Sequence, residues 1–274
     1  MANVSNPTTV THPSDDNTSQ HCQEAKNGIS IIIPAYNEKY RIKKSLDNYM
    51  PVIESFNLPY EVIVVIDGND GTEDVIRNYK NLDYFKSSVR LGKGGAVKKG
   101  LLMAQYRYVG FVDADGSLAP EDFKKLLQQI QDNYCVISSR YVKGSKWINK
   151  EPFFKRFASR GFNLFVNLVL NLKVKDTQCG AKFFKFDIIK KIIPQVEVTN
   201  WTFDVAILYH IKRMGYNIKE IPVKWSHDLG TKFNYTVSII PMFLTVIAIK
   251  LMNSRIKDYV PELLYKIVSK FKVY

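Results

Sequence analysis

The sequence contains few cysteines and no apolar run of the length that a membrane-spanning helix needs. Its cysteines, Cys22, Cys135 and Cys179, lie far apart, which argues against a disulfide framework or a zinc cluster and favours a reducing compartment. The most apolar stretch, Phe233–Ile249, has 17 uncharged residues interrupted by Pro241, whereas a spanning helix takes roughly 20. This stretch is therefore too short and too interrupted for a secure membrane span, yet too apolar for an ordinary surface helix.

Other common signals are also missing. Residues 1–27 contain no apolar segment, so we expect a disordered polar tail rather than a signal peptide. The glycine-rich spacings of the Walker A loop and of the dinucleotide-binding fold are absent, and no internal repeat is present. A nucleotide would therefore have to be bound by another kind of loop.

The net charge of +13 lies in the second half of the chain. Residues 1–134 carry 15 Lys and Arg against 17 Asp and Glu, whereas residues 135–274 carry 24 against 9. A basic half indicates an anionic partner, which could be nucleic acid, an anionic membrane surface or a phosphorylated substrate.

The first half alternates short β-branched runs with helical segments. Continuous apolar strands are predicted at Gly28–Pro34, Tyr60–Gly68 and Tyr108–Gly116, and a short strand from Lys86 leads into a glycine loop. Helices are predicted at about 39–55, 73–80 and after the glycine loop. Continuous rather than alternating apolar strands indicate a mostly parallel sheet with helices on both faces.

Each predicted strand ends in a polar cluster. The clusters are Tyr36-Asn37-Glu38, Asp67-Gly68-Asn69-Asp70 and Asp113-Ala114-Asp115. Because parallel strands present their carboxyl ends at one edge of the sheet, where ligands bind in such folds, we expect these clusters to converge.

The second half begins with a predicted strand at Tyr134–Gly144. A helix is predicted at Glu151–Leu172, where polar residues recur every three or four positions along one stripe. These residues are Arg156, Arg160, Asn163, Asn167 and Asn171.

Asp113 and Asp115 stand two residues apart where a buried strand ends. Carboxylates of this kind suit Mg²⁺ or Mn²⁺, which take one or two protein oxygens together with substrate phosphates. The alternative is that both carboxylates cap the next segment or lie solvated in a turn. The glycine loop Arg90–Gly95 opens a helix and carries Lys93, so it offers amides, a helix dipole and a cation to an anion; it could equally be a turn with solvated lysines.

Taken together and in this order, the stretches IIIPAYNE, VVIDGNDGTEDVI, RLGKGGAVKKGL and FVDADGS resemble the inverting glycosyltransferases of family 2, which have the GT-A fold. Within that family, RLGKGGAVKKGL, SSRYVKG, DTQCGAKFFK and WTFDVAIL are similar to enzymes that load a sugar onto dolichyl phosphate. The similarity is greatest to dolichyl-phosphate glucosyltransferases, through Asp176–Gly180, and it runs from Gly28 to Lys232.

For the donor, the resemblance implies a nucleotide sugar, with UDP-glucose as the expected one, and Mg²⁺ or Mn²⁺ as cofactor. Asp113 and Asp115 would hold the metal and the diphosphate, and Lys93 would lie by the nucleotide. The residues implied for the nucleoside are Pro34, Ala35, Tyr36, Glu38 and Asp67.

For the acceptor, the resemblance implies dolichyl or another polyprenyl phosphate. Arg140, with Arg156 or Arg160, and Lys232 would receive the phosphates. Asp176, Gln178 and Asp204 would lie around the sugar. The expected catalytic residues are Asp115, Arg140, Lys232 and Asp204.

The chemistry of the acceptor decides which side chains are needed. A phosphate monoester has a second pKa of about 6, so at neutral pH it is already a nucleophile and needs no general base. Attack in line at the anomeric carbon inverts it. Two alternatives stay open: GDP-mannose or another UDP-sugar as donor, and a non-phosphate acceptor that needs Asp204 or Asp176 as a base. A basic nucleic-acid-binding protein is a remote third, because no binding module is recognisable.

We expect three regions: the tail 1–27, a GT-A domain at 28–232, and a C-terminal amphipathic segment at 233–274. Residues 151–172 and 233–249 would lie at a membrane surface, with basic residues at anionic headgroups, or would pack as core helices. The expected location is the cytoplasmic face of a membrane, as a peripheral or monotopic protein.

Overall fold

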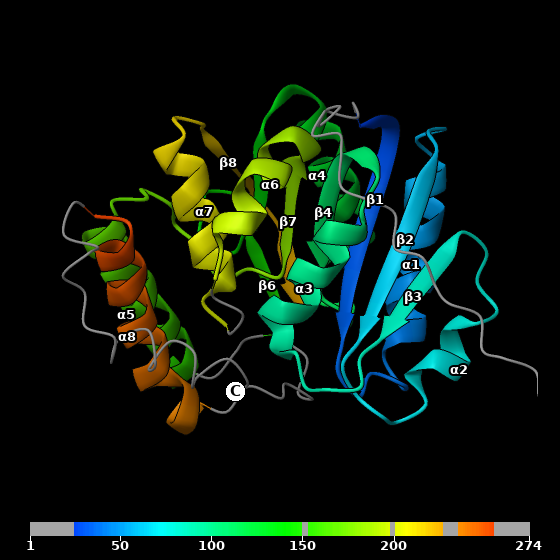
Figure 1. The fold of residues 1–274 in the computed structure, drawn as a ribbon, viewed down its shortest axis with the longest axis horizontal. Coiled ribbons are helices and arrows are strands. Elements are labelled where there is room, and N and C mark those ends of the chain that lie inside the picture. Colours follow the sequence, from blue (N-terminus) through cyan, green and yellow to red (C-terminus); the bar gives the residue numbers. More distant parts are fainter. Residues whose placement is uncertain (1–24, 150–152, 198–200, 227–234, 255–274) are drawn as a thin grey trace, which may run out of the picture.

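A seven-stranded sheet forms the centre of the protein, in the strand order β3-β2-β1-β4-β7-β5-β8 (Figure 1). The structure is a computed structural model that describes residues 25–149, 153–197, 201–226 and 235–254. The strands of this sheet are β1 (Lys26–Ala35), β2 (Tyr60–Ile66), β3 (Leu82–Lys86), β4 (Tyr106–Val112), β5 (Cys135–Ser139), β7 (Ala181–Lys185) and β8 (Ile218–Pro222). A separate parallel pair consists of β6 (Lys146–Asn149) and β9 (Lys224–Ser226).

The large sheet is parallel except at β7, which runs antiparallel to β4 and β5. The prediction of a mostly parallel sheet is confirmed. Because β7 is reversed, its first residue, Ala181, pairs with Val112, the last residue of β4. The loop that precedes β7 therefore reaches the edge at which the polar clusters of β1, β2 and β4 lie.

Helices cover both faces of the sheet, as predicted. The helices are α1 (Ile42–Glu54), α2 (Thr72–Ile76), α3 (Gly92–Met103), α4 (Pro120–Asp132), α5 (Phe153–Leu170), α6 (Phe186–Ile192), the 3-10 helix η1 (Ile193–Gln195), α7 (Phe203–Arg213) and α8 (Tyr235–Met252). Figure 1 shows α3, α6 and α7 in front of the sheet, with α1 and α4 behind it.

Two apolar cores lie on opposite faces of the sheet, and β1 contributes to both. Ile31 and Ile33 belong to the core beneath α1 and α4, whereas Ile32 belongs to the core beneath α3, α6 and α7. The alternation follows from the two-residue period of a strand. It explains why this strand is apolar throughout.

The predicted short strand at Lys86 is wrong in position, since β3 ends there and residues 87–91 form a loop. The strand that is present, Leu82–Lys86, lies at the sheet edge and leaves Asp83 and Tyr84 exposed. An edge strand that is open to solvent lacks the continuous apolar run on which the prediction relied.

The helices α5 and α8 pack side by side at one end of the sheet (Figure 1). The ring of Phe243 of α8 packs edge-on against Phe162 of α5 and at a tilt against Phe165, with ring centroids 5.4 and 4.6 Å apart. Val246 of α8 is fully buried in the core that also contains α7. The fold thus includes α8 in its core, while residues 255–274 of the expected C-terminal segment lie outside the described residues. Among the described residues, no helix is both long enough and apolar enough to span a membrane.

Close packing between β4 and β7 gives a stability prediction at Gly110. A Cβ at this position would lie 2.3 Å from a ring carbon of Phe183 and 2.5 Å from the backbone oxygen of Lys182. We expect Gly110→Ala to lower the free energy of unfolding by about 1–3 kcal/mol, the usual range for overpacking. Gly161→Ala is the matched control, because a Cβ there meets nothing within 4 Å and should stabilise α5 by about 0.5–1 kcal/mol. Urea unfolding followed by circular dichroism measures both; equal midpoints would contradict the packing argument.

Candidate active site at the carboxyl edge of the sheet

Asp113 and Asp115 lie in a tight turn after β4. Gly116 adopts a positive φ of 67°, which a residue with a side chain rarely does. Helix α1 anchors the turn, because the hydroxyl of Ser45 on this helix donates to the carbonyl of Ala114 at 2.6 Å. Both carboxylates are thus held at the edge by a backbone that is itself anchored.

The carboxylate of Asp113 lies between a cation and a glycine. Lys93 of α3 approaches its Oδ1 at 2.7 Å, and a Cβ on Gly180 would lie 2.0 Å from its Oδ2. Burial raises the pKa of Asp113, and nearby Asp115 raises it further, although Lys93 acts the other way. Burial alone would lower the pKa of Lys93, but Asp113 and Asp204 raise it above its ordinary value. The site therefore concentrates negative charge.

These carboxylates fit a divalent metal. In the part of the chain that the structure describes, no three His, Cys, Asp or Glu side chains cluster as a metal site. The protein would therefore supply Asp113 and Asp115 and leave the remaining positions to substrate and water, as Mg²⁺ and Mn²⁺ sites at phosphates do. A bound cation would stabilise the charged form of Asp113, whose pKa is raised by burial and, to a smaller extent, by Asp115.

The residues predicted for the nucleoside follow β1. Pro34 and Ala35 end the strand, and the half-exposed ring of Tyr36 lies under the guanidinium of Arg90, 3.4 Å from its centroid. The carboxylate of Glu38 accepts two hydrogen bonds from Arg41, at 2.6 and 2.7 Å. An aromatic ring at this edge, with the Arg90 guanidinium on one face, is suited to stacking against a nucleotide base.

Asp67 stabilises the start of α3. Its carboxylate accepts hydrogen bonds from the amides of Leu91 and Gly92, at 2.6 and 2.8 Å, and pairs with Arg90. Two of the amides that we expected the glycine loop to offer to an anion are therefore already engaged. Lys93, in contrast, extends from the same loop to the Asp113 carboxylate.

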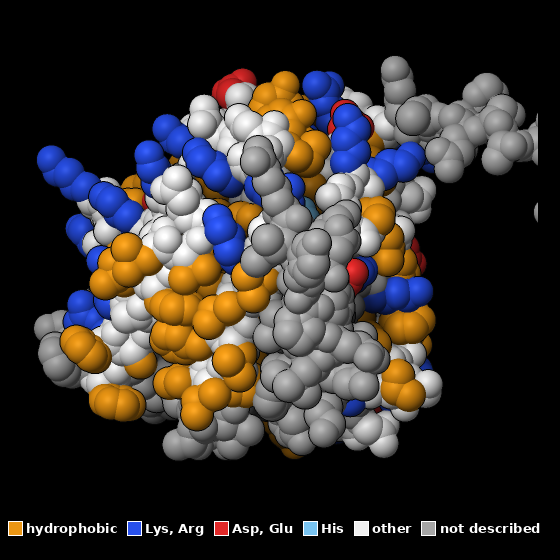
Figure 2. Space-filling view, turned by 60° about the vertical axis from the view of Figure 1, so that its left-hand side comes forward, with side chains coloured by type: hydrophobic (Ala, Val, Ile, Leu, Met, Phe, Trp, Pro, Cys, Tyr) orange, Lys and Arg blue, Asp and Glu red, His pale blue; other side chains and the backbone are white. Residues whose placement is uncertain are grey.

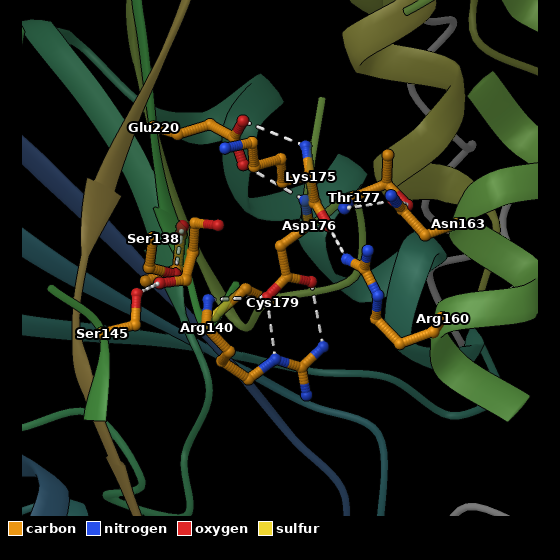
Figure 3. A network of polar contacts seen from close by, with 12 residues as sticks. Ser138, Arg140, Ser145, Arg160, Asn163, Lys175, Asp176, Thr177, Cys179 and Glu220 are labelled. Atoms are coloured by element: carbon orange, nitrogen blue, oxygen red, sulfur yellow. Dashed lines mark hydrogen bonds and ion pairs between the residues drawn. The ribbon is translucent and has the colours of Figure 1, made fainter. Parts of the chain in front are cut away.

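Asp176 is the centre of a second network, at the end of β5 (Figure 3). It accepts from the amide, Nε and Nη2 of Arg140 at 2.8–2.9 Å. Glu220 of β8 in turn accepts from the amides of Lys175 and Asp176. Burial alone would lower the pKa of Arg140, but the paired Asp176 raises it well above its ordinary value. The guanidinium of Arg140 is thus held in place by the Asp176 carboxylate.

The polar stripe of α5 faces this network. Asn163 accepts from the amide and hydroxyl of Thr177, and Asn167 exchanges hydrogen bonds with both backbone groups of Val174. Arg160 donates to the carbonyl of Lys175 at 3.3 Å. The stripe that the sequence predicts is therefore an anchor for the loop that carries Asp176.

Arg140, Arg156 and Arg160 gather around aromatic rings. Arg140 and Arg156 lie 5.8 and 5.4 Å from the ring of Trp147, and Arg160 lies 4.8 Å from that of Tyr141. Among the described residues, Asp176 is the only carboxylate that pairs with these guanidinium groups. We call the three arginines and the two aromatic residues, Tyr141 and Trp147, the arginine cluster. With three guanidinium groups and one paired carboxylate, the cluster has an excess of positive charge that suits a phosphate.

Asp204 lies in the first turn of α7 and pairs with Lys182 of β7, whose Nζ lies 2.8 Å from its Oδ1. Gln178 has a buried Nε2 without a hydrogen-bond partner within the described ranges. Lys232, which we expected near the phosphates, lies outside the described residues. The remaining candidates all occur at the carboxyl edge of the sheet or beside the loop before β7.

Several residues of the site escaped the sequence analysis: Gly180, Lys182, Tyr141, Trp147 and Glu220. Signals existed for three of them, because Gly180 and Lys182 lie in the stretch DTQCGAKFFK and Tyr141 lies in SSRYVKG, although no role was assigned to any of the three. The others act through contacts between distant segments, such as β6 with β9, which a linear pattern does not show.

Comparison with known proteins identifies the family. The family model of Glycosyl transferase family 2 matches residues 30–193. The chain is 31% identical to a dolichyl-phosphate beta-glucosyltransferase of Dictyostelium discoideum, over 81% of this chain and 73% of that one. It is 34% identical to the enzyme of the same name from Drosophila melanogaster, over 74% and 68%.

Among solved structures, glucosyl-3-phosphoglycerate synthase of Mycobacterium tuberculosis, in complex with Mn²⁺, uridine-diphosphate-glucose and phosphoglyceric acid, superimposes with a TM-score of 0.66. The identity is 16%, and 84% of this chain and 82% of that chain are covered. This likeness supports the GT-A-like α/β fold. From the family match and the identity to its relatives, the chain belongs to glycosyl transferase family 2.

Proposed function

We propose that this protein transfers glucose from UDP-glucose to dolichyl phosphate, with inversion and with a divalent metal, and so makes a lipid-phosphate sugar. The observation that carries the proposal is the identity of 31–34% to dolichyl-phosphate beta-glucosyltransferases over most of the chain. The structure adds a carboxylate pair and an arginine cluster at one edge of the sheet, as the two anionic substrates require.

The donor side is formed by the ends of β1, β2 and β4. Asp113 and Asp115 would hold Mg²⁺ or Mn²⁺, which when bound neutralises the diphosphate and stabilises it as a leaving group. The structural neighbour with Mn²⁺ and uridine-diphosphate-glucose supports this donor and a divalent metal. Tyr36, backed by Arg90, would stack the base, and Lys93 would approach the diphosphate.

The acceptor side is formed by the arginine cluster. A phosphate monoester would bind to Arg140, Arg156 and Arg160 through charge-assisted hydrogen bonds. One of its oxygens forms a bond to the anomeric carbon while the bond from that carbon to the diphosphate oxygen breaks. No proton has to move, because the acceptor is already ionised, and attack opposite an α-linked diphosphate gives a β-linked product.

The rival acceptor, a hydroxyl group, would need Asp176 or Asp204 as a general base. Both carboxylates are paired with cations: Asp176 with the fork of Arg140 and Asp204 with Lys182. Carboxylate oxygens that already bind a cation are less accessible to the proton of a hydroxyl acceptor. This pairing supports a phosphate acceptor, for which neither residue has to remove a proton.

The face formed by α5 and α8 favours a position at a membrane surface. Figure 2 shows hydrophobic side chains gathered on the lower part of this end of the molecule and Lys and Arg side chains on its upper part. Phe154, Phe157, Leu164 and Leu168 of α5 are each more than 60% exposed, which is unusual for a surface in water. We propose that this face lies on the cytoplasmic side of a membrane, where a lipid acceptor is found, as a peripheral or monotopic contact.

Transfer of labelled sugar tests the proposed function. Purified protein is incubated with dolichyl phosphate, Mn²⁺ or Mg²⁺ and a panel of radiolabelled nucleotide sugars, and label in the organic phase is counted. We expect label from UDP-glucose only with metal present, and Asp115→Asn should lower the rate about 10²-fold or more, as loss of a group that stabilises charge does. If the label enters the lipid from GDP-mannose or another UDP-sugar, that nucleotide sugar is the donor in place of UDP-glucose. If no labelled lipid forms, the proposed acceptor is wrong.

Gly180→Ala tests the carboxylate site. The new methyl group would displace Asp113, which is a flexible side chain with 26% exposure, so we expect little change in the free energy of unfolding. Affinity for UDP in the presence of Mn²⁺ should fall roughly 10–100-fold, as when the support of a metal ligand is lost. Calorimetric titration measures the affinity, with Gly161→Ala as control. Equal affinities in the two variants would contradict the role of Asp113.

The exposed face of α5 gives a prediction for membrane binding. Phe157→Ser combined with Leu168→Ser should reduce flotation with vesicles of phosphatidylcholine and phosphatidylserine about tenfold or more, since each buried apolar side chain contributes about 1.5–3 kcal/mol. The control is Leu102→Ser on α3, which is also largely exposed, at 62%, but lies outside this face. Flotation of the double variant at the wild-type level would overturn the assignment of this face.

A further inference from the structure

The ring of Trp147 lies within cation–π distance of two arginines of the acceptor side. Its centroid is 5.8 Å from Cζ of Arg140, which follows β5, and 5.4 Å from Cζ of Arg156, which belongs to α5. The ring of Tyr141 packs against it at a tilt, with centroids 6.0 Å apart, and lies 4.8 Å from Cζ of Arg160. One tryptophan thus contacts guanidinium groups from two segments that are distant in the sequence.

Carboxylates hold only one of these arginines. Within the described ranges, Asp176 pairs with Arg140, and no Asp or Glu forms an ion pair with Arg156 or Arg160. Like charges that gather in one place repel each other, and fixing a long side chain costs conformational entropy. In place of an ion pair, the described residues offer Arg156 the ring of Trp147.

An aromatic ring holds a guanidinium group differently from a carboxylate. The ring attracts the cation through the face of its π system, whereas a carboxylate binds the N–H donors and neutralises the charge. Arg140 shows the second kind of contact, because its Nε and Nη2 donate to Asp176, and Figure 3 shows its third nitrogen directed away from that carboxylate. An arginine held by a ring therefore keeps its charge and its donors available for an anion.

The small sheet that carries Trp147 contacts the segment that follows the metal-site carboxylates. Trp147 of β6 is the register partner of Trp225 of β9, which bridges to Leu118. The amide of Ser226 donates to the carbonyl of Ser117 at 3.2 Å. These backbone contacts place the arginine cluster next to the metal site, and they do not involve the side chain of Trp147.

Core packing is the alternative explanation for Trp147. Its ring is partly buried against the core beneath α1 and α4, and another apolar side chain of similar size would fill much of that space. Leucine would do so without attracting a cation, whereas phenylalanine would keep an aromatic face. These two replacements separate a role in packing from a role in holding the arginines.

We propose that Trp147 is a positioning residue for the acceptor phosphate: its ring keeps the guanidinium groups of Arg140 and Arg156 together, with charge and donors open to the phosphate. The inference rests on the proposed function, which assigns the arginine cluster to the acceptor, and deepens it. A ring suits this task better than a further carboxylate, because a carboxylate would compete with the phosphate for the same donors.

Binding of farnesyl phosphate, a short polyprenyl phosphate, tests the inference by calorimetric titration of the full chain with Mn²⁺ and UDP present. Farnesol, which lacks the phosphate, measures binding of the hydrocarbon chain alone. We expect Trp147→Leu to weaken phosphate-dependent binding roughly tenfold, as the loss of cation–π contacts to two arginines predicts. Trp147→Phe should restore it to within about threefold of the wild type, because an aromatic face remains.

The affinity for UDP with Mn²⁺, titrated separately, should not change in either variant. The metal turn is anchored by Ser45 of α1 and contacted by the backbone of β9, and neither contact uses the replaced side chain. Ile148→Ala is the matched control, because Ile148 lies on the same strand and is 60% exposed; it should match the wild type with both ligands. If Trp147→Leu does not fold, Trp147→Met, whose flexible side chain fills irregular apolar space, takes its place with the same expected loss.

The outcomes separate the inference from the proposed function. Equal affinities for farnesyl phosphate in Trp147→Leu and Trp147→Phe would overturn the inference, because the aromatic face would then make no difference. Equal losses of farnesyl phosphate and UDP would show a merely structural role and overturn it as well. Both results leave transfer of glucose by the wild type intact. A wild type that binds farnesyl phosphate as expected but transfers no glucose to a lipid overturns the proposed function, while the binding pattern still supports a phosphate site that Trp147 holds in place.

Discussion

The contact between Gly180 and Asp113 is the constraint on which the site depends. β7 runs against its neighbours, and this reversal places the loop before it beside the end of β4. Only a residue without a side chain can lie against the Asp113 carboxylate there, since a Cβ would approach within 2.0 Å. The segment that carries Asp176 and Gln178 is thereby joined to the segment that carries Asp113 and Asp115.

Around this contact, most acidic groups of the site are paired with cations from another element. Lys93 of α3 meets Asp113 of the β4 turn, Arg140 meets Asp176, and Lys182 of β7 meets Asp204 of α7. Such pairs link neighbouring elements, and breaking one leaves an uncompensated charge. The site is therefore held in shape by electrostatics before any substrate is bound, which reduces the ordering that binding requires.

The sequence predicted the parts of the fold that depend on local pattern. The continuous β-branched runs of β1, β2 and β4 indicated buried parallel strands, and the acidic residues after them indicated the edge that binds ligands. β3 was misplaced, because an edge strand exposed at Tyr84 does not show that pattern. The helix predicted at 73–80 is shorter, Thr72–Ile76, since the chain must turn at Asn81, with a positive φ of 54°, to enter β3.

Within the site, the residue types were predictable but their partners were not. The polar stripe of α5 was visible in the sequence, yet its partner, the loop around Val174 and Thr177, follows from tertiary packing. Asp67 shows the same limit: its place after β2 suggested a ligand contact, and its carboxylate caps α3. Position in a motif indicates where a side chain lies, but not which of its atoms are already engaged.

The pairing of its carboxylates bears on which acceptors this edge of the sheet can serve. A general base must be an open carboxylate within reach of the proton it removes. Asp176, with 2% of its side chain exposed, is enclosed by Arg140, whose backbone amide and guanidinium both donate to it. Removing Arg140 would free that carboxylate but would also remove a cation from the arginine cluster. The same ion pair thus encloses the carboxylate that would have to act as the base and holds in place the cation proposed for the acceptor phosphate, and both effects favour an acceptor that arrives already ionised.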